Sequence, residues 1–284
     1  FYRMGDFYEL FFDDAKIAAS HLGIALTKRG KINDQEIPMC GVPVHSSQTY
    51  LSRLIKSGFK VAIAEQLEEK TKKIENKKGP KIFKRDVVKI ITPGTILEDS
   101  LLESKSHNHL LSISVFRGDV SLAWIDMTTG SIKLQRIAGS KFKEDLLECM
   151  NKIEPGEIII SYEQIKLNFL KENLKSFEKI VTEVPPSFFD VQNNKEKIQD
   201  FFQSSRIESI GDLFDNDISA TGALLNYLEL TQKKNIPLVK NFEILNKNDY
   251  MQIDMFSEKS LEIFQKTDGE KRGSLIDGID KTKT

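Results

Sequence analysis

Three consecutive segments in which apolar and polar residues alternate restrict the fold more than any other feature of this chain. They are 109–116 (HLLSISVF), 119–127 (DVSLAWIDM) and 131–137 (SIKLQRI). Short turn sequences containing Gly118 and Gly130 separate them. Alternation with a period of two, interrupted by such turns, predicts antiparallel strands joined as a meander.

The residues after the meander alternate between helical and extended patterns. We expect a helix at 141–152, a strand at 156–161 and a helix at 162–174, with further helices around 194–202 and 220–232. A meander followed by such alternation predicts a ribonuclease H-like α/β domain. A later unit begins near residue 236, and 257–265 (SEKSLEIFQ) is a candidate helix in it.

The first hundred residues predict a mixed sheet with two helices. The helices are expected at 13–23, begun by Asp13 or Asp14 and ended by Gly23, and at 46–58, begun by Ser46 or Ser47 and ended by Gly58. Extended segments are expected at 7–12, 24–30, 35–45, 59–66 and 86–95, with a glycine-rich turn after 24–30. The predicted fold class is therefore mixed α/β (α+β), with domains at 1–98, 99–235 and 236–284.

The opening strand places a carboxylate among aromatic residues. Side chains of a strand alternate between its faces, so Phe7 and Glu9 share one face while Tyr8 lies on the other. A lone buried carboxylate is costly, which predicts that the Phe7 and Glu9 face is at least partly wet. Two interpretations remain open: a surface phenylalanine beside a solvated glutamate, or an aromatic ring and an acceptor presented together to a ligand.

Composition excludes several classes of protein. The 284 residues are 39% hydrophobic and 29% charged, as in ordinary globular proteins, and no apolar run is long enough to cross a bilayer. We expect a cytoplasmic protein, a fragment of a longer chain, with no membrane partner. Cys40 and Cys149 are far apart, which indicates neither a disulfide framework nor a zinc site. Residues 70–89 carry nine Lys or Arg, as a polyanion-facing surface or a solvated loop would.

Catalytic patterns are weak. A ribonuclease H-like outline raises a metal-dependent nuclease, which needs several carboxylates around two Mg²⁺ ions. The first meander strand has no acid, Asp126 lies late on the second, and Asp119 fits a turn. His107 and His109 have no third metal ligand nearby, and no phosphate loop or nucleophile motif is present. We expect no catalytic centre, metal or cofactor within this chain.

Several segments of the sequence resemble those of a known protein family. They are FYRMGDFYELFFDDAK, LTKRG, IPMCGVPVH, YLSRLIKSGFKVAIAEQ and VVKIITPGT, followed by HLLSISV, DMTTGSIKL, ALLNYLELTQ, LEIFQ and GSLIDGIDKT. Their order and spacing resemble the MutS family of DNA mismatch repair proteins over essentially the whole chain. The resemblance implies a mismatch-recognition domain at 1–98, a ribonuclease H-like connector domain at 99–235, and the start of a helical core or lever domain at 236–284.

The resemblance implies a role for the Phe7 and Glu9 pair. In this family the aromatic residue of an F-x-E motif is wedged into the base stack at a mispair, and the glutamate hydrogen-bonds a mispaired base. A wedge lodges where pairing is already broken, because unstacking costs less there. A carboxylate near phosphates disfavours intact duplex, so it is tolerated only where a base-edge donor or an acquired proton completes a hydrogen bond.

Other residues match the family with less specific motifs. A segment along the minor groove is implied for Met39, Gly41, Pro43 and His45. Candidate phosphate contacts are Lys28, Arg29, Arg3, Arg53, Lys84 and Lys89. Each could instead be a residue of a tight loop or a solvated cation. The sequence departs from many relatives at Cys40 and Val44, and the lysine-rich loop at 70–85 has no fixed counterpart.

The resemblance also implies partners and cofactors. The full-length parent would be a homodimer that binds double-stranded DNA containing mismatches or small loops, with a downstream repair factor of the MutL type, in the bacterial cytoplasm and associated with the nucleoid. It would bind ATP and Mg²⁺ at an ATPase domain outside this chain, which itself would not be an enzyme. Two other classes remain: the metal-dependent nuclease, and a structural connector with no ligand of its own.

Overall fold

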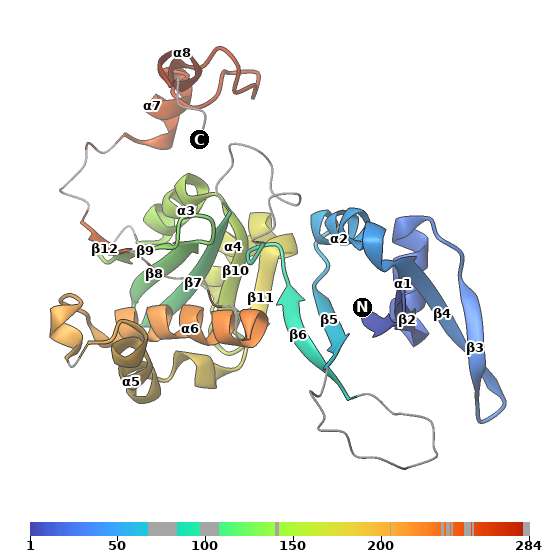
Figure 1. Cartoon of the computed structure of the whole chain (residues 1–284). Coiled ribbons are helices and arrows are strands. Elements are labelled where there is room, and N and C mark those ends of the chain that lie inside the picture. The colour runs from blue at the N-terminus through green and yellow to red at the C-terminus, as the bar shows by residue number, and fades with distance from the viewer. Residues whose placement is uncertain are drawn as a thin grey trace. The chain divides into compact units, whose positions relative to one another are not determined.

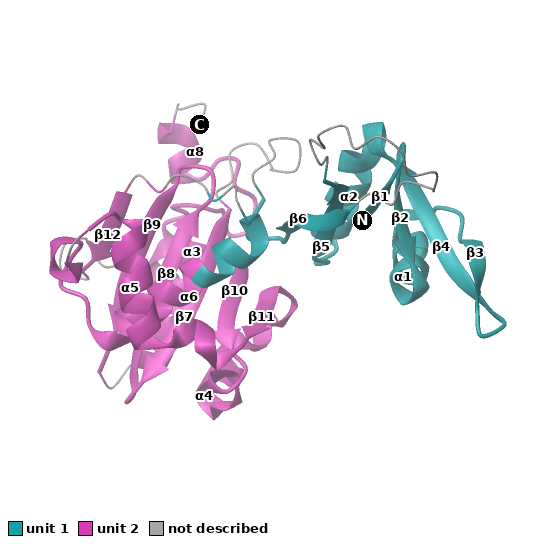
Figure 2. Ribbon diagram, turned by 60° about the horizontal axis from the view of Figure 1, so that its bottom comes forward, with its two compact units in different colours: residues 1–101, 226–237 teal, residues 102–225, 238–284 magenta. Residues whose placement is uncertain are grey.

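The computed structural model describes residues 1–67, 84–96, 108–139, 142–204, 206–233, 236, 239, 241–246, 251 and 253–280. The chain divides into two compact units, which are drawn in different colours in Figure 2. The amino-terminal unit comprises 1–101 and 226–237, and the second unit comprises 102–225 and 238–284. The predicted domain boundaries at 98 and 235 stay a prediction.

The amino-terminal unit is built on a six-stranded mixed sheet with the strand order β3-β4-β2-β1-β5-β6 (Figure 1). Its strands are β1 (Tyr2–Met4), β2 (Phe7–Phe11), β3 (Thr27–Ile32), β4 (Gln35–Pro43), β5 (Val61–Gln66) and β6 (Arg85–Ile91). Its helices are α1 (Phe12–Leu22), the 3₁₀ turn η1 (Val44–Ser46) and α2 (Ser47–Lys56). The end of the β3–β4 hairpin projects beyond the other strands (Figure 1).

One face of this sheet packs against α1. Cys40 is buried, and its Sγ lies 3.5 Å from the carbonyl oxygen of Ala15 in α1. Tyr8 and Val42, which are partners across β2 and β4, are buried as well. Buried residues of α2, namely Leu51, Leu54 and Ile55, complete the core, as the apolar stripe of that helix predicts.

The second unit contains a six-stranded sheet with the order β11-β10-β7-β8-β9-β12. Its strands are β7 (His109–Phe116), β8 (Asp119–Asp126), β9 (Ser131–Ile137), β10 (Pro155–Ser161), β11 (Val181–Val184) and β12 (Asn241–Leu245). The first three form the predicted antiparallel meander, and β10, β11 and β12 join it in parallel. This confirms the mixed α/β class and the ribonuclease H-like arrangement of strands.

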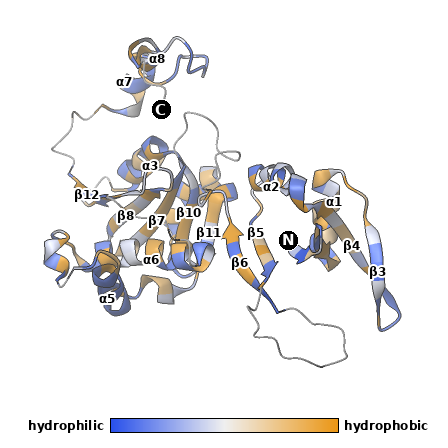
Figure 3. Cartoon of the chain, viewed as in Figure 1, coloured by the Kyte–Doolittle hydropathy of each residue, from blue (hydrophilic) through white to orange (hydrophobic). Residues whose placement is uncertain are grey.

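Helices cover both faces of the second sheet. They are α3 (Phe142–Ile153), α4 (Asn168–Leu174), α5 (Val191–Phe201) and α6 (Asp215–Gln232), with 3₁₀ turns η2 (Gln164–Lys166), η3 (Lys175–Ile180), η4 (Pro186–Phe189) and η5 (Ile207–Ser209). Only the part of α6 up to residue 225 belongs to this unit. Leu146 and Met150 of α3 pack with Leu111 and Leu122 of the sheet, whereas Ala220 of α6 packs against the opposite face. The hydrophobic colouring of β10 in Figure 3 agrees with its burial on both faces of the sheet.

Some local expectations were wrong. Helix α1 begins at Phe12 after an N-cap, Phe11, whose side chain makes no capping hydrogen bond, so neither Asp13 nor Asp14 caps it. The β3–β4 turn is formed by Asn33 and Asp34, both with positive φ, rather than by glycine, because Asn and Asp also tolerate the left-handed region.

Two other helices are shorter than predicted, whereas α5 and α6 are longer. The 162–174 helix is interrupted at Leu167, whose backbone is extended. The helix predicted at 257–265 is α7 (Met255–Ser260), followed by α8 (Leu275–Ile279). In the part of the chain that the structure describes, no helix is long and apolar enough to cross a membrane.

Candidate nucleic-acid interface

Strand β2 presents Phe7 to solvent from the middle of the amino-terminal sheet. The Phe7 residue is 47% exposed, whereas its neighbour Tyr8 is 8% exposed and faces the core. The side chain of Glu9, on the same face as Phe7, is 13% exposed. Tyr8 therefore faces the core while Phe7 and Glu9 share the opposite face, as the alternation in the sequence predicts. The aromatic ring and the carboxylate lie side by side on that face.

Three residues of β4 that were expected along the minor groove lie opposite residues on this face of β2. Pro43 is the cross-strand partner of Phe7, Gly41 of Glu9, and Met39 of Phe11. A Cβ at Gly41 would lie 3.8 Å from Cδ1 of Phe7 and 3.9 Å from Cγ of Glu9. We call the surface formed by Phe7, Glu9, Met39, Gly41 and Pro43 the β2–β4 face.

A tight turn fixes the position of Phe7. Gly5 has φ +60 and lies between β1 and β2, a conformation that glycine adopts without steric cost. The backbone N–H of Val44 donates to the carbonyl oxygen of Asp6 at 2.9 Å, which ties this turn to the end of β4. Phe7 is therefore held by hydrogen-bonded backbone on both sides, and the exposed ring stands on a rigid support. His45, in η1, is exposed just beyond Pro43.

Arg29 reaches the β2–β4 face, although Lys28 does not contact it. The Nη1 of Arg29 donates to Oε2 of Glu9, while Lys28 pairs with Glu36 of the same hairpin. The register of β3 and β4 shifts between Lys28 and Lys31, where Gly30 has φ +73. Such a bulge re-aims the side chains around it.

Two other predicted phosphate contacts are engaged within the protein. Arg53 donates from Nη1 to the carbonyl oxygen of Leu22 at 2.8 Å and from Nη2 to that of His21 at 3.1 Å, and so caps the carboxyl end of α1. Arg3 donates from Nε to Gly5 O at 2.6 Å, and its guanidinium lies 5.5 Å from the Tyr8 ring centre. Arg3 is paired with Tyr8 across β1 and β2, on the face opposite Phe7.

The remaining two lysines lie at the far edge of the sheet. Lys84 precedes β6 and Lys89 belongs to it, and β1 and β5 separate β6 from β2. The structure does not bring them to the β2–β4 face, and their role at phosphates stays a prediction. Most of the lysine-rich loop at 70–85 lies outside the described residues.

The carboxylates of the second unit do not form a metal site among the described residues. A cavity of about 970 Å³ is lined by several acids, including Asp126, Glu148 and Asp254. Asp126 Oδ1 accepts from the backbone N of Thr128 at 2.9 Å and from its Oγ1 at 2.7 Å, as a turn residue does.

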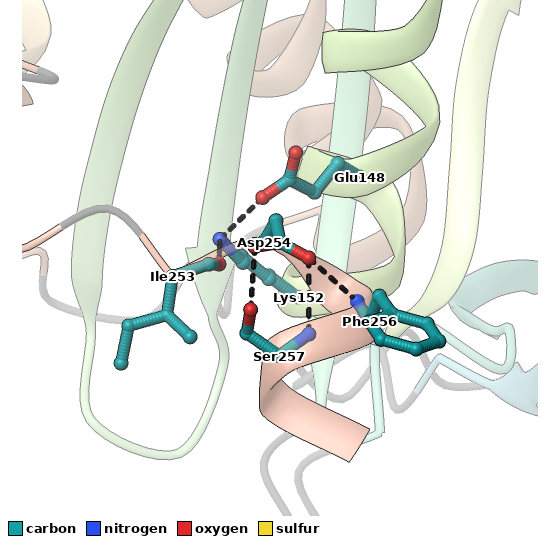
Figure 4. A network of polar contacts seen from close by, with 6 residues as sticks. All are labelled: Glu148, Lys152, Ile253, Asp254, Phe256 and Ser257. Carbon is teal, nitrogen blue, oxygen red and sulfur yellow. Dashed lines mark hydrogen bonds and ion pairs between the residues drawn. The ribbon is translucent and has the colours of Figure 1, made fainter. Parts of the chain in front are cut away.

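The other acids of this cavity have partners as well. Lys152 donates to Glu148 at 2.7 Å, and Asp254 accepts from Ser257 Oγ at 2.7 Å and from two backbone N–H groups of α7 at 3.0 Å (Figure 4). The hydrogen bonds from Ser257 hold the pKa of Asp254 below its usual range. Nδ1 of His109 lies 2.5 Å from Ile153 O, while His107 lies outside the described residues. The nuclease alternative is not favoured.

Sequence reasoning missed two features next to the β2–β4 face. One is the ion pair between Glu9 and Arg29, for which the sequence carries no local signal. The other is Tyr2, the cross-strand partner of Glu9 in β1, which is exposed and lies beneath the guanidinium of Arg85. The Gly5-Asp6 turn sequence between two extended segments was the signal for this β1–β2 hairpin.

Comparisons with known proteins agree with the resemblance. Residues 1–100 match the family described as MutS domain I, and residues 108–240 match MutS domain II. Over its whole length the chain is 44%, 42% and 39% identical to the proteins named DNA mismatch repair protein MutS of Wolbachia pipientis wMel, Ehrlichia chaffeensis and Dinoroseobacter shibae. The alignments cover 33%, 34% and 31% of those proteins, so the chain spans about a third of their length.

Proposed function

Because this chain belongs to the MutS family of DNA mismatch repair proteins, we propose that its amino-terminal unit recognises mispaired bases in double-stranded DNA. The observation that carries the proposal is Phe7, a residue that is 47% exposed although its strand is paired on both sides, with Glu9 beside it on the same face. In a sequence matched to MutS domain I, this is the geometry that a wedge and a base acceptor require.

The wedge acts by testing how easily the duplex deforms. Inserting a side chain between base pairs unstacks a step and bends the DNA, at a cost of a few kcal/mol in sound duplex. A mispair has already lost part of that stability, so Phe7 enters there at lower cost. Gly41 and Pro43 allow close approach because neither places a long side chain next to the ring.

Glu9 provides a second basis for discriminating mispaired from paired DNA. Its carboxylate can accept a hydrogen bond from a base edge that a mispair leaves exposed. In a fully paired duplex those donors are already occupied, and a negative charge near phosphates is unfavourable. Glu9 therefore favours the mispaired site by its bond and disfavours paired DNA by its charge.

The rest of the chain and its partners follow from the same family. We propose that the second unit connects mismatch binding to parts of the parent protein outside these residues, where ATP and Mg²⁺ would bind. The chain itself performs no chemical step in this proposal. The parent would act as a homodimer and engage a downstream repair factor of the MutL type.

The test uses the natural full-length protein with the substitution Phe7→Ala. Loss of aromatic stacking should cost about 1–3 kcal/mol, or about 5- to 150-fold in affinity for mispaired DNA, and should leave the salt-sensitive binding to paired DNA. Fluorescence anisotropy with matched G·T and G·C oligonucleotides at two ionic strengths measures both. Phe116→Ala removes an exposed phenylalanine of the second unit and serves as the control. Retained discrimination in the Phe7 variant would refute the proposal.

A further inference from the structure

We propose that Arg29 is a positioning residue for mismatch discrimination, which acts by holding one oxygen of Glu9 so that the other stays directed to the DNA. The inference rests on the proposed function, because it concerns how Glu9 does its work. It replaces the simpler expectation that Arg29 contacts only a phosphate.

The first support is the path of Arg29 across the sheet. Arg29 belongs to β3, and β4 lies between β3 and the strand that carries Glu9. The β4 residue opposite Glu9 is Gly41, which has no side chain to stand between them. The bulge between Lys28 and Lys31 alters the direction of this part of β3. Arg29 thus reaches a specific acid two strands away, whereas Lys28 pairs with Glu36 within its own hairpin.

The second support is the use of the two carboxylate oxygens. Arg29 donates to Oε2 of Glu9. Among the described residues, no hydrogen bond is made to Oε1. A carboxylate can accept several hydrogen bonds, so Oε1 remains available to a base-edge donor while Oε2 is held.

The third support is the difference in exposure within the pair. The Glu9 side chain is 13% exposed and that of Arg29 is 49% exposed. The acid is therefore the more enclosed partner of the pair. The contact of the planar guanidinium with Oε2 restricts the rotamers that the Glu9 side chain can adopt.

A double-mutant cycle in the natural full-length protein tests this inference. Arg29→Gln, Glu9→Gln and the double variant are titrated with G·T and fully paired duplexes. For residues in direct contact we expect a coupling of about fivefold. Arg29→Gln should thus weaken mispair binding about fivefold when Glu9 is present, and less than about twofold in the Glu9→Gln background.

Two further variants act as controls. Lys28→Gln removes a cation from the same strand without touching Glu9, so its effect should be equal in both backgrounds. Arg29→Lys keeps a cation that can still pair with Glu9, so it should recover most of the discrimination lost in Arg29→Gln. Thermal melting of each variant establishes that it is folded, and Arg29 lies on an exposed strand where substitution is tolerated.

The outcomes separate the inference from the proposed function. Equal losses for Arg29→Gln in both backgrounds, with the slope of log affinity against log salt reduced by about one, would make Arg29 a phosphate contact and overturn the inference alone. Discrimination that survives Phe7→Ala would overturn the proposed function instead. A fivefold coupling that Lys28→Gln does not reproduce would support Arg29 as the residue that positions Glu9.

Discussion

Replacing Gly41 with alanine should raise the stability of the fold and lower the affinity for mispaired DNA, so that the two effects can be measured separately. Gly41 lies in the middle of β4, outside the left-handed region of the backbone. An added Cβ would lie 3.6 Å from the carbonyl oxygen of Tyr8, 3.8 Å from Phe7 Cδ1 and 3.9 Å from Glu9 Cγ, all ordinary van der Waals distances. Alanine therefore fits the free protein, and it reduces the freedom of the unfolded chain. We expect stability to rise by about 0.5 kcal/mol.

The same methyl group should weaken DNA binding. It would fill the space between the wedge and the acid, where the proposed duplex comes closest to the sheet. Overpacking a close-fitting contact costs about 1–3 kcal/mol, or about 5- to 150-fold in affinity for mispaired DNA. Thermal melting by circular dichroism and titration of the full-length protein with G·T duplex measure the two effects separately.

Gly23→Ala is the matched control for this experiment. Gly23 ends α1 with φ +66, so alanine there is strained even though no atom lies within 4 Å of the added Cβ. It should lower stability by about 1 kcal/mol and leave DNA affinity unchanged. If Gly41→Ala lowers stability as Gly23→Ala does, the packing argument fails. If Gly41→Ala binds the mispaired duplex as tightly as the wild type, the duplex does not approach this strand.

Two further predictions concern buried groups. Asp217 is fully buried and accepts from Ser121 Oγ at 2.7 Å, Arg136 Nε at 2.7 Å and the backbone N of Phe214 at 2.9 Å. Asp217→Ala should therefore destabilise the second unit by about 3 kcal/mol, measured by urea unfolding. A change below about 1 kcal/mol, which we expect for the exposed control Asp215→Ala, would contradict this. Burial raises the pKa of the Cys40 thiol. Iodoacetamide at pH 8 should therefore alkylate Cys40 far more slowly in the folded chain than in urea. Equal alkylation rates, measured by peptide mass spectrometry, would show that Cys40 is not buried.

Local patterns in the sequence were sufficient for much of the fold. Alternation placed Tyr8 inside and Phe7 outside, and the three segments from 109 to 137 formed the meander, because strand periodicity depends only on neighbouring residues. The identity of helix-capping groups was less predictable. The carboxyl end of α1 is capped by Arg53, which is 31 residues from Leu22, and no local rule connects these two positions.

The sequence alone determined which residues could form the β2–β4 face: an aromatic residue and an acid two positions apart on a strand, in a string specific to one family. Only the tertiary structure decided what surrounds them. Strand order and the bulge in β3 bring Arg29 to Glu9, and they leave Lys84 and Lys89 at the opposite edge of the sheet. The physical reason is that side-chain alternation is local, whereas the pairing of strands depends on turns, register and packing between residues far apart in the chain.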